Sequence, residues 1–288
     1  MSNKVLLDNI KRLRELTGVG FKDCKSALDE SNGDIEKSIE FLRKKGIAKA
    51  SKKMSRTATE GLALVKEDLG NIALIEINSE TDFVAKNKDF ISFCKELSDI
   101  NFKVKGNLDE LLKMKMANNV LVSDNLVSLI SKIGEKITIR RAIFFDNSKG
   151  KNFYYVHSAL DKNIGKIISV VKLDGIKEGT NDEIGVKVAM HIAASSPLAI
   201  NSEDIDKKIV EKELEIIKAE IVNSGKPDEM AEKISKGKIS KFLSENSLMN
   251  QIWIMDSKKK VSDVLRENSS EKSLKILNFV RYKVGEGI

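Results

Sequence analysis

The segment "NSETDFVAKN", residues 78–87, places one aromatic side chain, Phe83, among acids, amides and hydroxyls directly after an apolar stretch. Such a segment could bind a partner through its polar groups, and covering the ring would add about 2–3 kcal/mol. The residues alone leave two interpretations open. The ring either turns inward and seals the edge of its own sheet, or it projects outward as a contact for a second molecule. Because aromatic residues in loops commonly pack on their own core, the inward interpretation is favoured at this point.

The two histidines are the next candidates for chemistry. His191 lies on an apolar helical face beside Ala193 and Ala194, which favours a buried structural histidine. His157 ends the predicted strand 152–158, near the loop side of a sheet, where its polar tip could reach a partner. A structural role fits the pattern of His157 at least as well.

Other residue patterns argue against catalysis and against bound groups. Cys24 and Cys94 lie at apolar helical positions without CxxC spacing, so we expect buried, reduced thiols rather than a disulfide or a metal site. The sequence contains no GxxxxGKS or GxxxxGKT, no GxGxxG after a strand, and no HExxH or GxSxG motif. We therefore expect no direct nucleotide binding, no cofactor, no metal and no enzymatic activity.

Bulk composition predicts a folded, cytoplasmic protein of about two domains. The chain has 288 residues, 41% of them hydrophobic, and no apolar run near the roughly 20 residues that span a membrane. The first ten residues lack the order of a signal peptide. A net charge of +7 favours an acidic partner, either a nucleic acid or a protein. Only 5% of residues are aromatic and the lysines are scattered, so nucleic acid is the weaker alternative.

The elements that position these residues begin with a predicted three-helix module, residues 1–46. Its apolar residues recur at helical spacing: Leu6, Ile10, Leu13 and Leu16; Phe21, Cys24 and Leu28; Ile35, Ile39 and Leu42. Gly33 and Asp34 fit the end of the second helix and the N-cap of the third, and Gly46 is expected to end the third. The basic stretch 47–60 is predicted to be a linker.

A strand pair followed by an amphipathic helix is predicted twice. Strands 61–65 and 70–78 precede one such helix, and strands 152–158 and 165–173 precede another. This pattern predicts an α+β fold with two related core subdomains, each a small antiparallel sheet with a helix on one face.

A further helix and strand are predicted between the two units. The helix ends at Gly134, and "KITIRRAIFF", residues 136–145, follows as a strand. We assign residues 61–145 to the first core subdomain, and residues 146–201 together with 246–288 to the second.

Residues 202–245 have a narrow apolar stripe among dense charges, which predicts a protruding, antiparallel coiled-coil hairpin. The stripe residues are Ile205, Ile209, Leu214, Ile217, Ile221, Met230, Ile234, Ile239 and Phe242. Since this stripe buries little else, formation of a homodimer through the hairpin stays open as an alternative.

Six blocks of the sequence, in order, resemble the bacterial-type elongation factor Ts family. They are "LRELTGVGFKDCKSALDESNGDIEKSIEFLRKKG" (13–46), "NSETDFVAKN" (78–87), "IGEKITIRRA" (133–142), "HIAASSP" (191–197), "SGKPDEMAEKI" (224–234) and "RYKVGEGI" (281–288). The resemblance implies a guanine nucleotide exchange factor that binds elongation factor Tu with GDP, loosens magnesium and nucleotide, and leaves when GTP enters. It also implies a ubiquitin-associated-like N-terminal module ahead of the two subdomains and the hairpin.

The resemblance also assigns partner-binding residues. Asp82 and Phe83 match the residues that press on the nucleotide-binding domain of elongation factor Tu, and with this match we expect Phe83 to face outward. His157 takes the place of a histidine associated with rearrangement of the phosphate-binding loop, and Ile133 and Gly134 match a further core contact. The docking residues implied for the N-terminal module are Lys11, Arg14, Val19, Gly20 and Phe21. The Phe21-Lys22 pair stands where family members often carry two apolar residues.

Overall fold

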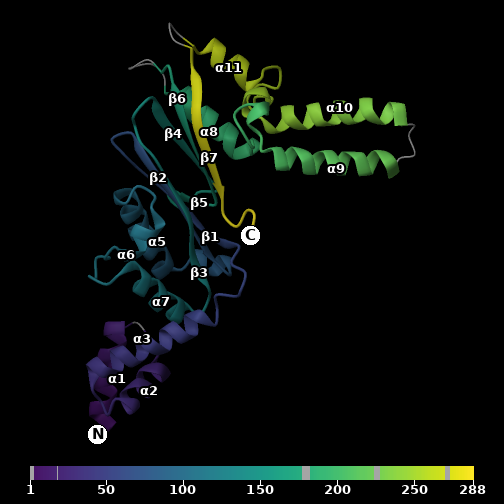
Figure 1. Ribbon diagram of the computed structural model, residues 1–288. Helices are drawn as coiled ribbons and strands as arrows, with labels where there is room; N and C mark the ends of the chain where they lie inside the picture. Colours follow the sequence, from purple (N-terminus) through teal and green to yellow (C-terminus); the bar gives the residue numbers. More distant parts are fainter. Residues whose placement is uncertain (1–2, 18, 177–181, 224–227, 270–272) are drawn as a thin grey trace.

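The computed structural model describes residues 3–17, 19–176, 182–223, 228–269 and 273–288. It has the predicted α+β fold, with a three-helix module at one end, two antiparallel sheets in the middle and a helical hairpin that projects sideways (Figure 1). Within these residues, no helix is both long enough and apolar enough to cross a membrane.

The N-terminal module consists of α1 (Asn3–Thr17), α2 (Phe21–Glu30) and α3 (Ile35–Ser51). Its separate core contains Ile10, Leu13, Cys24, Ala27, Leu28 and Leu42. The predicted caps are confirmed, since Gly33 has a φ of 84° and the Asp34 carboxylate accepts a hydrogen bond from the Lys37 backbone N–H at 3.1 Å. The helical spacing therefore identified this module correctly.

The prediction that the third helix ends at Gly46 is wrong, because α3 continues to Ser51. Arg43 of α3 forms an ion pair with Asp124 at 2.7 Å, and a Cβ on Gly46 would lie 3.6 Å from Ser131. Ala50 is buried in the core of the first sheet. Packing against a neighbouring helix outweighs the weak helix propensity of glycine, so the first part of the expected linker is helical.

The first sheet has the order β3-β2-β1-β5. Its strands are β1 (Glu60–Asp68), β2 (Asn71–Ser79), β3 (Ile137–Phe145) and β5 (Ile164–Gly165). The accompanying helices are α4 (Asp82–Ala85), α5 (Lys88–Lys103), α6 (Leu108–Lys113) and α7 (Val122–Ile133). Leu62, Leu64, Ile75 and Ile77 of β1 and β2 pack with α5 and α7 in one core cluster.

The second sheet has the order β4-β6-β7. Its strands are β4 (Lys151–His157), β6 (Ile167–Asp174) and β7 (Lys275–Lys283), and its helices are α8 (Glu183–Ser195) and α11 (Val261–Glu267). The strand predicted over 165–173 is divided, because Gly165 pairs with Ala63 in the first sheet. A Cβ on Gly165 would lie 2.8 Å from the His157 carbonyl oxygen, and this close approach favours a glycine where the chain crosses between sheets.

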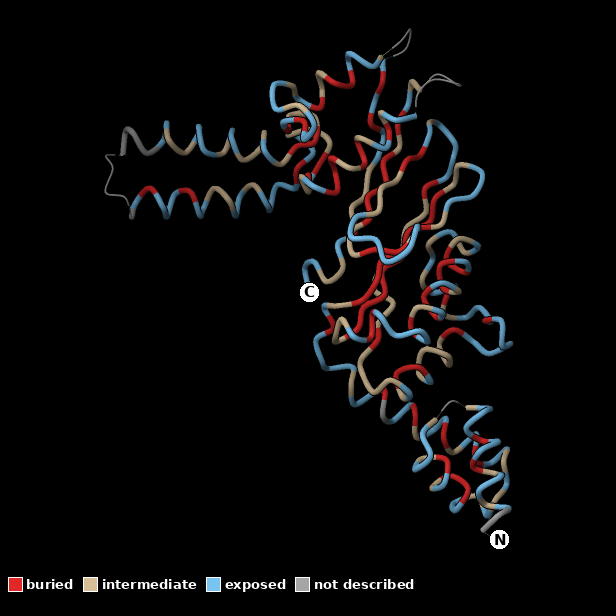
Figure 2. Tube along the Cα trace, turned by 180° about the vertical axis from the view of Figure 1, so that it is seen from behind, coloured by how far each residue is buried: buried red, intermediate tan, exposed pale blue. Residues whose placement is uncertain are grey.

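The two sheets pack against each other through the faces that do not carry helices. Residues of the first sheet contact residues of the second in one cluster: Ala63, Val65, Ile72, Leu74 and Phe145 with Ile168, Val170 and Tyr282. Strand β2 is therefore buried on both faces, which explains its nearly unbroken apolar run. Figure 2 shows buried residues concentrated in these central strands, with a separate group inside the N-terminal module.

The hairpin consists of α9 (Lys207–Asn223) and α10 (Asp228–Asn246), which lie side by side in Figures 1 and 2. Two short 3-10 helices, Ser202–Asp204 and Leu248–Asn250, lie at its base. Ile217 and Ile221 are buried, whereas Ile209 is exposed. The predicted turn at 224–227 lies outside the described residues.

Candidate functional site

Phe83 projects into solvent, with 79% of its surface exposed. It lies on the four-residue helix α4, whose next two residues, Val84 and Ala85, are buried in the core of the first sheet. The turn thus anchors itself through its neighbours and presents the ring outward. The outward orientation expected from the resemblance is confirmed, and the inward interpretation is wrong.

The residue before Phe83 in the chain, Asp82, is part of an ion pair. Asp82 pairs with Lys86 at 2.8 Å, and this hydrogen bond, assisted by the positive charges of Lys86 and Lys166, lowers the pKa of Asp82. Lys166 also binds Glu60 at 2.6 Å, which connects the start of β1 to the segment between the two sheets. Phe83 is therefore an apolar contact beside an ionised carboxylate, and such a surface can bind a protein through both kinds of group.

His157 lies exposed at the end of β4. Its Cα is paired with that of Ile167, the residue after Lys166, and its Nδ1 lies 3.3 Å from the Tyr155 hydroxyl. His157 therefore lies beside the short segment at which the chain passes from β5 of the first sheet to β6 of the second.

Ile133 and Gly134 lie at the end of α7. Ile133 is partly buried against the core of the first sheet, and Gly134 ends the helix with a φ of 86°, as predicted. The next residue, Glu135, accepts two hydrogen bonds from Thr81, directly before Asp82. The structure therefore brings this pair next to the segment that carries Phe83.

Four of the five docking residues assigned to the N-terminal module line one groove of about 590 Å³. Lys11, Arg14, Val19 and Phe21 line it together with Leu7, which is more than half exposed, and Lys132 of α7. Gly20 is the N-cap of α2, with open space where a side chain would lie. Since Lys132 directly precedes Ile133, the end of α7 connects this groove to the Phe83 segment.

Sequence reasoning missed the polar residues that hold the site in place. Thr81 and Glu135 fix the start of the Phe83 turn, and Glu80 accepts hydrogen bonds from Arg56 and from the Lys136 backbone N–H. Burial raises the pKa of Glu80, but these hydrogen bonds and the Arg56 charge outweigh it and lower the pKa overall. Two features of the sequence could have indicated these contacts. One is the acid beside a hydroxyl in "NSETDF", and the other is the acid after the helix-ending glycine in "IGEK".

A buried carboxylate, Glu76 of β2, links the first sheet to the segment that follows β7 of the second sheet. It binds Arg140 at 3.0 Å and Arg141 at 2.5 Å, and it accepts a hydrogen bond from the Gly285 backbone N–H at 3.0 Å. The Arg141 guanidinium lies 4.1 Å from the centre of the Tyr282 ring. Burial raises the pKa of Glu76, but these hydrogen bonds lower it overall. The carboxylate is therefore ionised, and the two arginines balance its negative charge.

His191 is buried, as predicted. Its ring stacks on Trp253 with centroids 5.2 Å apart, and its Nε2 lies 3.0 Å from Gln251 Oε1. Burial lowers the pKa of His191 despite the opposing effect of this hydrogen bond. With Ile254 N–H directed at Nδ1, both ring nitrogens are occupied, and the residue has a structural role.

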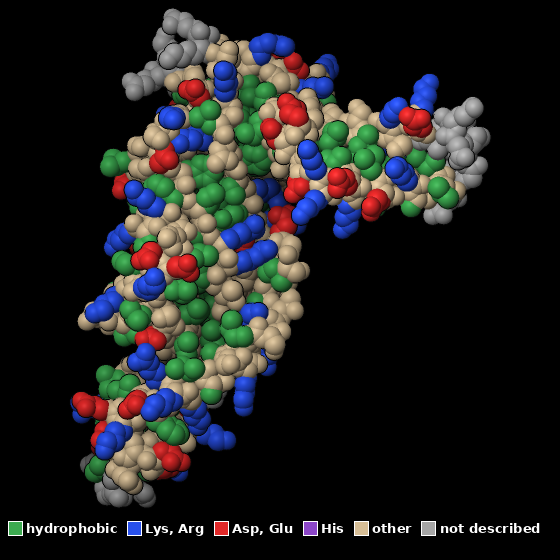
Figure 3. Space-filling view, viewed as in Figure 1, with side chains coloured by type: hydrophobic (Ala, Val, Ile, Leu, Met, Phe, Trp, Pro, Cys, Tyr) green, Lys and Arg blue, Asp and Glu red, His purple; other side chains and the backbone are tan. Residues whose placement is uncertain are grey.

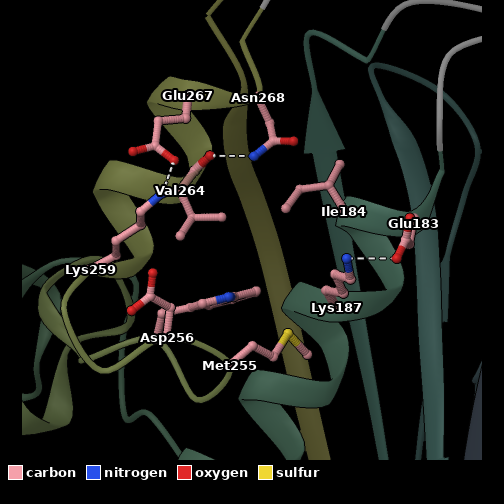
Figure 4. A pocket seen from close by; sticks show the side chains of 10 residues that line it. Glu183, Ile184, Lys187, Met255, Asp256, Lys259, Val264, Glu267 and Asn268 are labelled. Carbon is pink, nitrogen blue, oxygen red and sulfur yellow. Dashed lines mark hydrogen bonds and ion pairs between the residues drawn. The ribbon is translucent and has the colours of Figure 1, made fainter.

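A hollow of about 280 Å³ in the second core half is lined by Trp253 and by several charged side chains (Figure 4). Those charges pair locally, Lys187 with Glu183 at 2.6 Å and Lys259 with Glu267 at 2.5 Å. Across the part of the chain that the structure describes, no group of three or more His, Cys, Asp or Glu residues could hold a metal ion.

Comparison with known proteins identifies the family. The family model described as "Elongation factor TS" matches residues 80–286. A protein of Clostridium kluyveri named "Elongation factor Ts" is 42% identical over 287 residues, which covers 97% of this chain and 92% of that protein. A protein of Methylobacterium nodulans with the same name is 40% identical over 283 residues, with the same two coverages. The chain therefore belongs to the elongation factor Ts family.

Proposed function

We propose that the protein is a guanine nucleotide exchange factor for elongation factor Tu and acts in the cytoplasm during translation elongation. The observation that carries the proposal is the exposed Phe83 ring beside the ionised Asp82, in a chain of the elongation factor Ts family. The factor binds the GDP form of its partner, weakens the binding of magnesium and nucleotide, and performs no bond chemistry itself.

Phe83 supplies only part of the free energy that exchange requires. Transfer of a phenylalanine side chain from water to an apolar site is worth about 2–3 kcal/mol. Reversing a strongly biased two-state equilibrium requires about 5.5 kcal/mol of differential binding. The remainder is assigned to His157, to the end of α7 and to the groove of the N-terminal module.

These contacts promote exchange only if they are stronger to the nucleotide-free partner than to its GDP form. Equal affinity for both forms would leave the nucleotide equilibrium unchanged. By reciprocity, GDP weakens the binding of the factor by the same ratio as the factor weakens the binding of GDP.

The surface favours a protein partner over a nucleic acid. On the face shown in Figure 3, hydrophobic side chains gather over the sheets, while Lys and Arg side chains are scattered. An RNA-binding surface would require a basic strip with stacking aromatic residues.

The test is the release of a fluorescent GDP analogue from elongation factor Tu, with excess unlabelled GDP as the chase. Addition of the factor should increase the release rate by orders of magnitude in a concentration-dependent way. Excess magnesium should oppose the increase. A release rate that is independent of the factor would refute the proposal.

A further inference from the structure

Two short segments beside the site hold each other by reciprocal hydrogen bonds. The Glu135 carboxylate accepts a hydrogen bond from the Thr81 backbone N–H at 3.0 Å, and the Glu80 carboxylate accepts one from the Lys136 backbone N–H at 2.6 Å. Each segment thus provides one acid and one backbone donor. We call residues 80, 81, 135 and 136 the clasp.

Thr81 uses its side chain in an unusual way for its position. It is the N-cap of α4, where a threonine hydroxyl ordinarily accepts a hydrogen bond from the helix, yet no such bond is present. Its hydroxyl instead donates to Glu135 at 2.8 Å, and its carbonyl accepts a hydrogen bond from the Ser79 hydroxyl at 3.0 Å. The start of α4 is therefore fixed by the residue that follows α7.

The helix α4 is too short to hold its own orientation. It has four residues, and an isolated helical turn is unstable in water because one hydrogen bond does not offset the ordering of several dihedral angles. Val84 and Ala85 anchor one side of the turn in the core, and the clasp fixes its beginning, two residues before Phe83. Together they define the direction in which the ring projects.

Gly134 supplies the change of chain direction on which the clasp depends. Its φ of 86° is a conformation that favours glycine, although a Cβ there would meet no atom within 4 Å. The glycine is therefore required by the backbone rather than by lack of space. It directs Glu135 towards Thr81.

We infer that the clasp is a positioning device for Phe83, with Glu135 and Thr81 as its positioning residues. This inference rests on the proposed exchange function. An exposed ring held in one orientation loses less conformational entropy when a partner covers it, so pre-organisation strengthens the contact that the ring makes.

The experiment measures fluorescent GDP release from elongation factor Tu against factor concentration for Glu135→Ala, Thr81→Val and Thr81→Ser. Loss of one hydrogen bond to a charged group corresponds to an effect of about 10- to 100-fold. Thr81→Val, which loses one such bond, should lower the maximal rate about tenfold, and Glu135→Ala, which loses both, should lower it at least as much. The half-saturating concentration should change less, because the groove and His157 still bind. Thr81→Ser keeps the hydroxyl and should restore most of the rate.

Two controls separate positioning from a general loss of structure. Glu110→Ala removes an exposed acid of α6 that pairs only with Lys113 in the described residues, and it should leave the rate unchanged. The double variant Phe83→Ala with Glu135→Ala should release GDP as slowly as Phe83→Ala alone, because the clasp acts through the ring. Additive losses would overturn the inference.

Amide hydrogen exchange of the free protein tests the clasp without the partner. Residues 81–86 should exchange faster in Glu135→Ala than in the wild type, and equal exchange would overturn the inference. If Phe83→Ala slows release while Glu135→Ala does not, the clasp fails and the exchange function stands. If the wild-type chain does not accelerate release at all, the proposed function fails, and the amide measurement still decides whether the clasp holds the segment.

Discussion

At the scale of single residues, the direction of Phe83 distinguishes a surface contact from a core residue. Its ring is 79% exposed, whereas Val84 and Ala85 are buried. These three residues occupy consecutive positions of one helical turn, so the orientation of the turn decides which of them faces the core.

Replacing Phe83 by alanine should change exchange but not stability. Because the ring has little intramolecular contact to lose, the melting temperature of Phe83→Ala should stay within about 2 °C of the wild type. The rate of GDP release from elongation factor Tu should fall by about tenfold or more, since about 2 kcal/mol of apolar contact is removed. A large drop in melting temperature with an unchanged release rate would contradict this role.

Glu76 should make the protein sensitive to acid. Its pKa is lowered from 4.5 in the folded state, so the unfolded chain binds more protons below that pH. The stability contributed by Glu76 is complete above about pH 4.5 and is lost as the pH falls through the lowered pKa. In urea unfolding, Glu76→Gln should lose about 2–3 kcal/mol at pH 7 and show a weaker pH dependence as the pH falls below the ordinary pKa of a glutamate.

Glu110→Gln provides the matched control for this measurement. Its ion pair with Lys113 is exposed, and exposed pairs contribute about 0–1 kcal/mol. Equal losses for Glu76→Gln and Glu110→Gln would show that the contacts of Glu76 contribute no special stability.

At the scale of elements, α3 shows how packing overrides a local signal. Glycine is typical of a helix end, yet the helix continues through Gly46 because α3 packs along α7 and places Ala50 in the core. The N-terminal module is thereby joined to the first sheet by a helix.

Gly46 and Gly61 should respond to alanine in opposite ways. Gly46 is helical and has room for a Cβ at ordinary contact distance, so Gly46→Ala should stabilise the protein by about 0.5–1 kcal/mol. Gly61 has a φ of 132°, and its Cβ would lie 2.1 Å from the Ile77 carbonyl oxygen. Gly61→Ala should destabilise the protein by more than about 1 kcal/mol in calorimetry. Destabilisation by Gly46→Ala would contradict the continuous helix.

At the scale of the whole molecule, the two core halves share one interior. Both sheets contribute to the cluster between them, and the two residues of β5, which follows β4 in the chain, pair with β1 of the first sheet. If one half unfolded alone, the other half would expose the apolar surface that the two sheets bury between them. We therefore expect the halves to unfold together.

The single tryptophan, Trp253, provides a probe of the second half. Its fluorescence change in urea should coincide with the loss of amide protection in β2 of the first half. Ile168→Ala, at the contact between the sheets, should cost about 2–5 kcal/mol and shift both transitions by the same amount. A shift of the Trp253 transition alone would show that the halves unfold independently.

The sequence by itself determined the elements and their types. Helical and alternating apolar spacing identified the three-helix module, the main strands and the hairpin, because these patterns reflect which face of each element is buried. The blocks "NSETDFVAKN" and "IGEKITIRRA" also pointed to the residues that lie together at the candidate site.

Only the tertiary structure decided how these elements face one another. The packing of sheet against sheet, the continuation of α3 past Gly46 and the division of the strand at Gly165 depend on contacts between residues far apart in the chain. The same is true of Phe83, whose helical turn is held by the buried Val84 and Ala85 and by Glu135, which lies 54 residues from the threonine that binds it. The spacing of apolar residues encodes which face of each element is buried. The rest of the fold decides what covers that face and which side chains stay exposed.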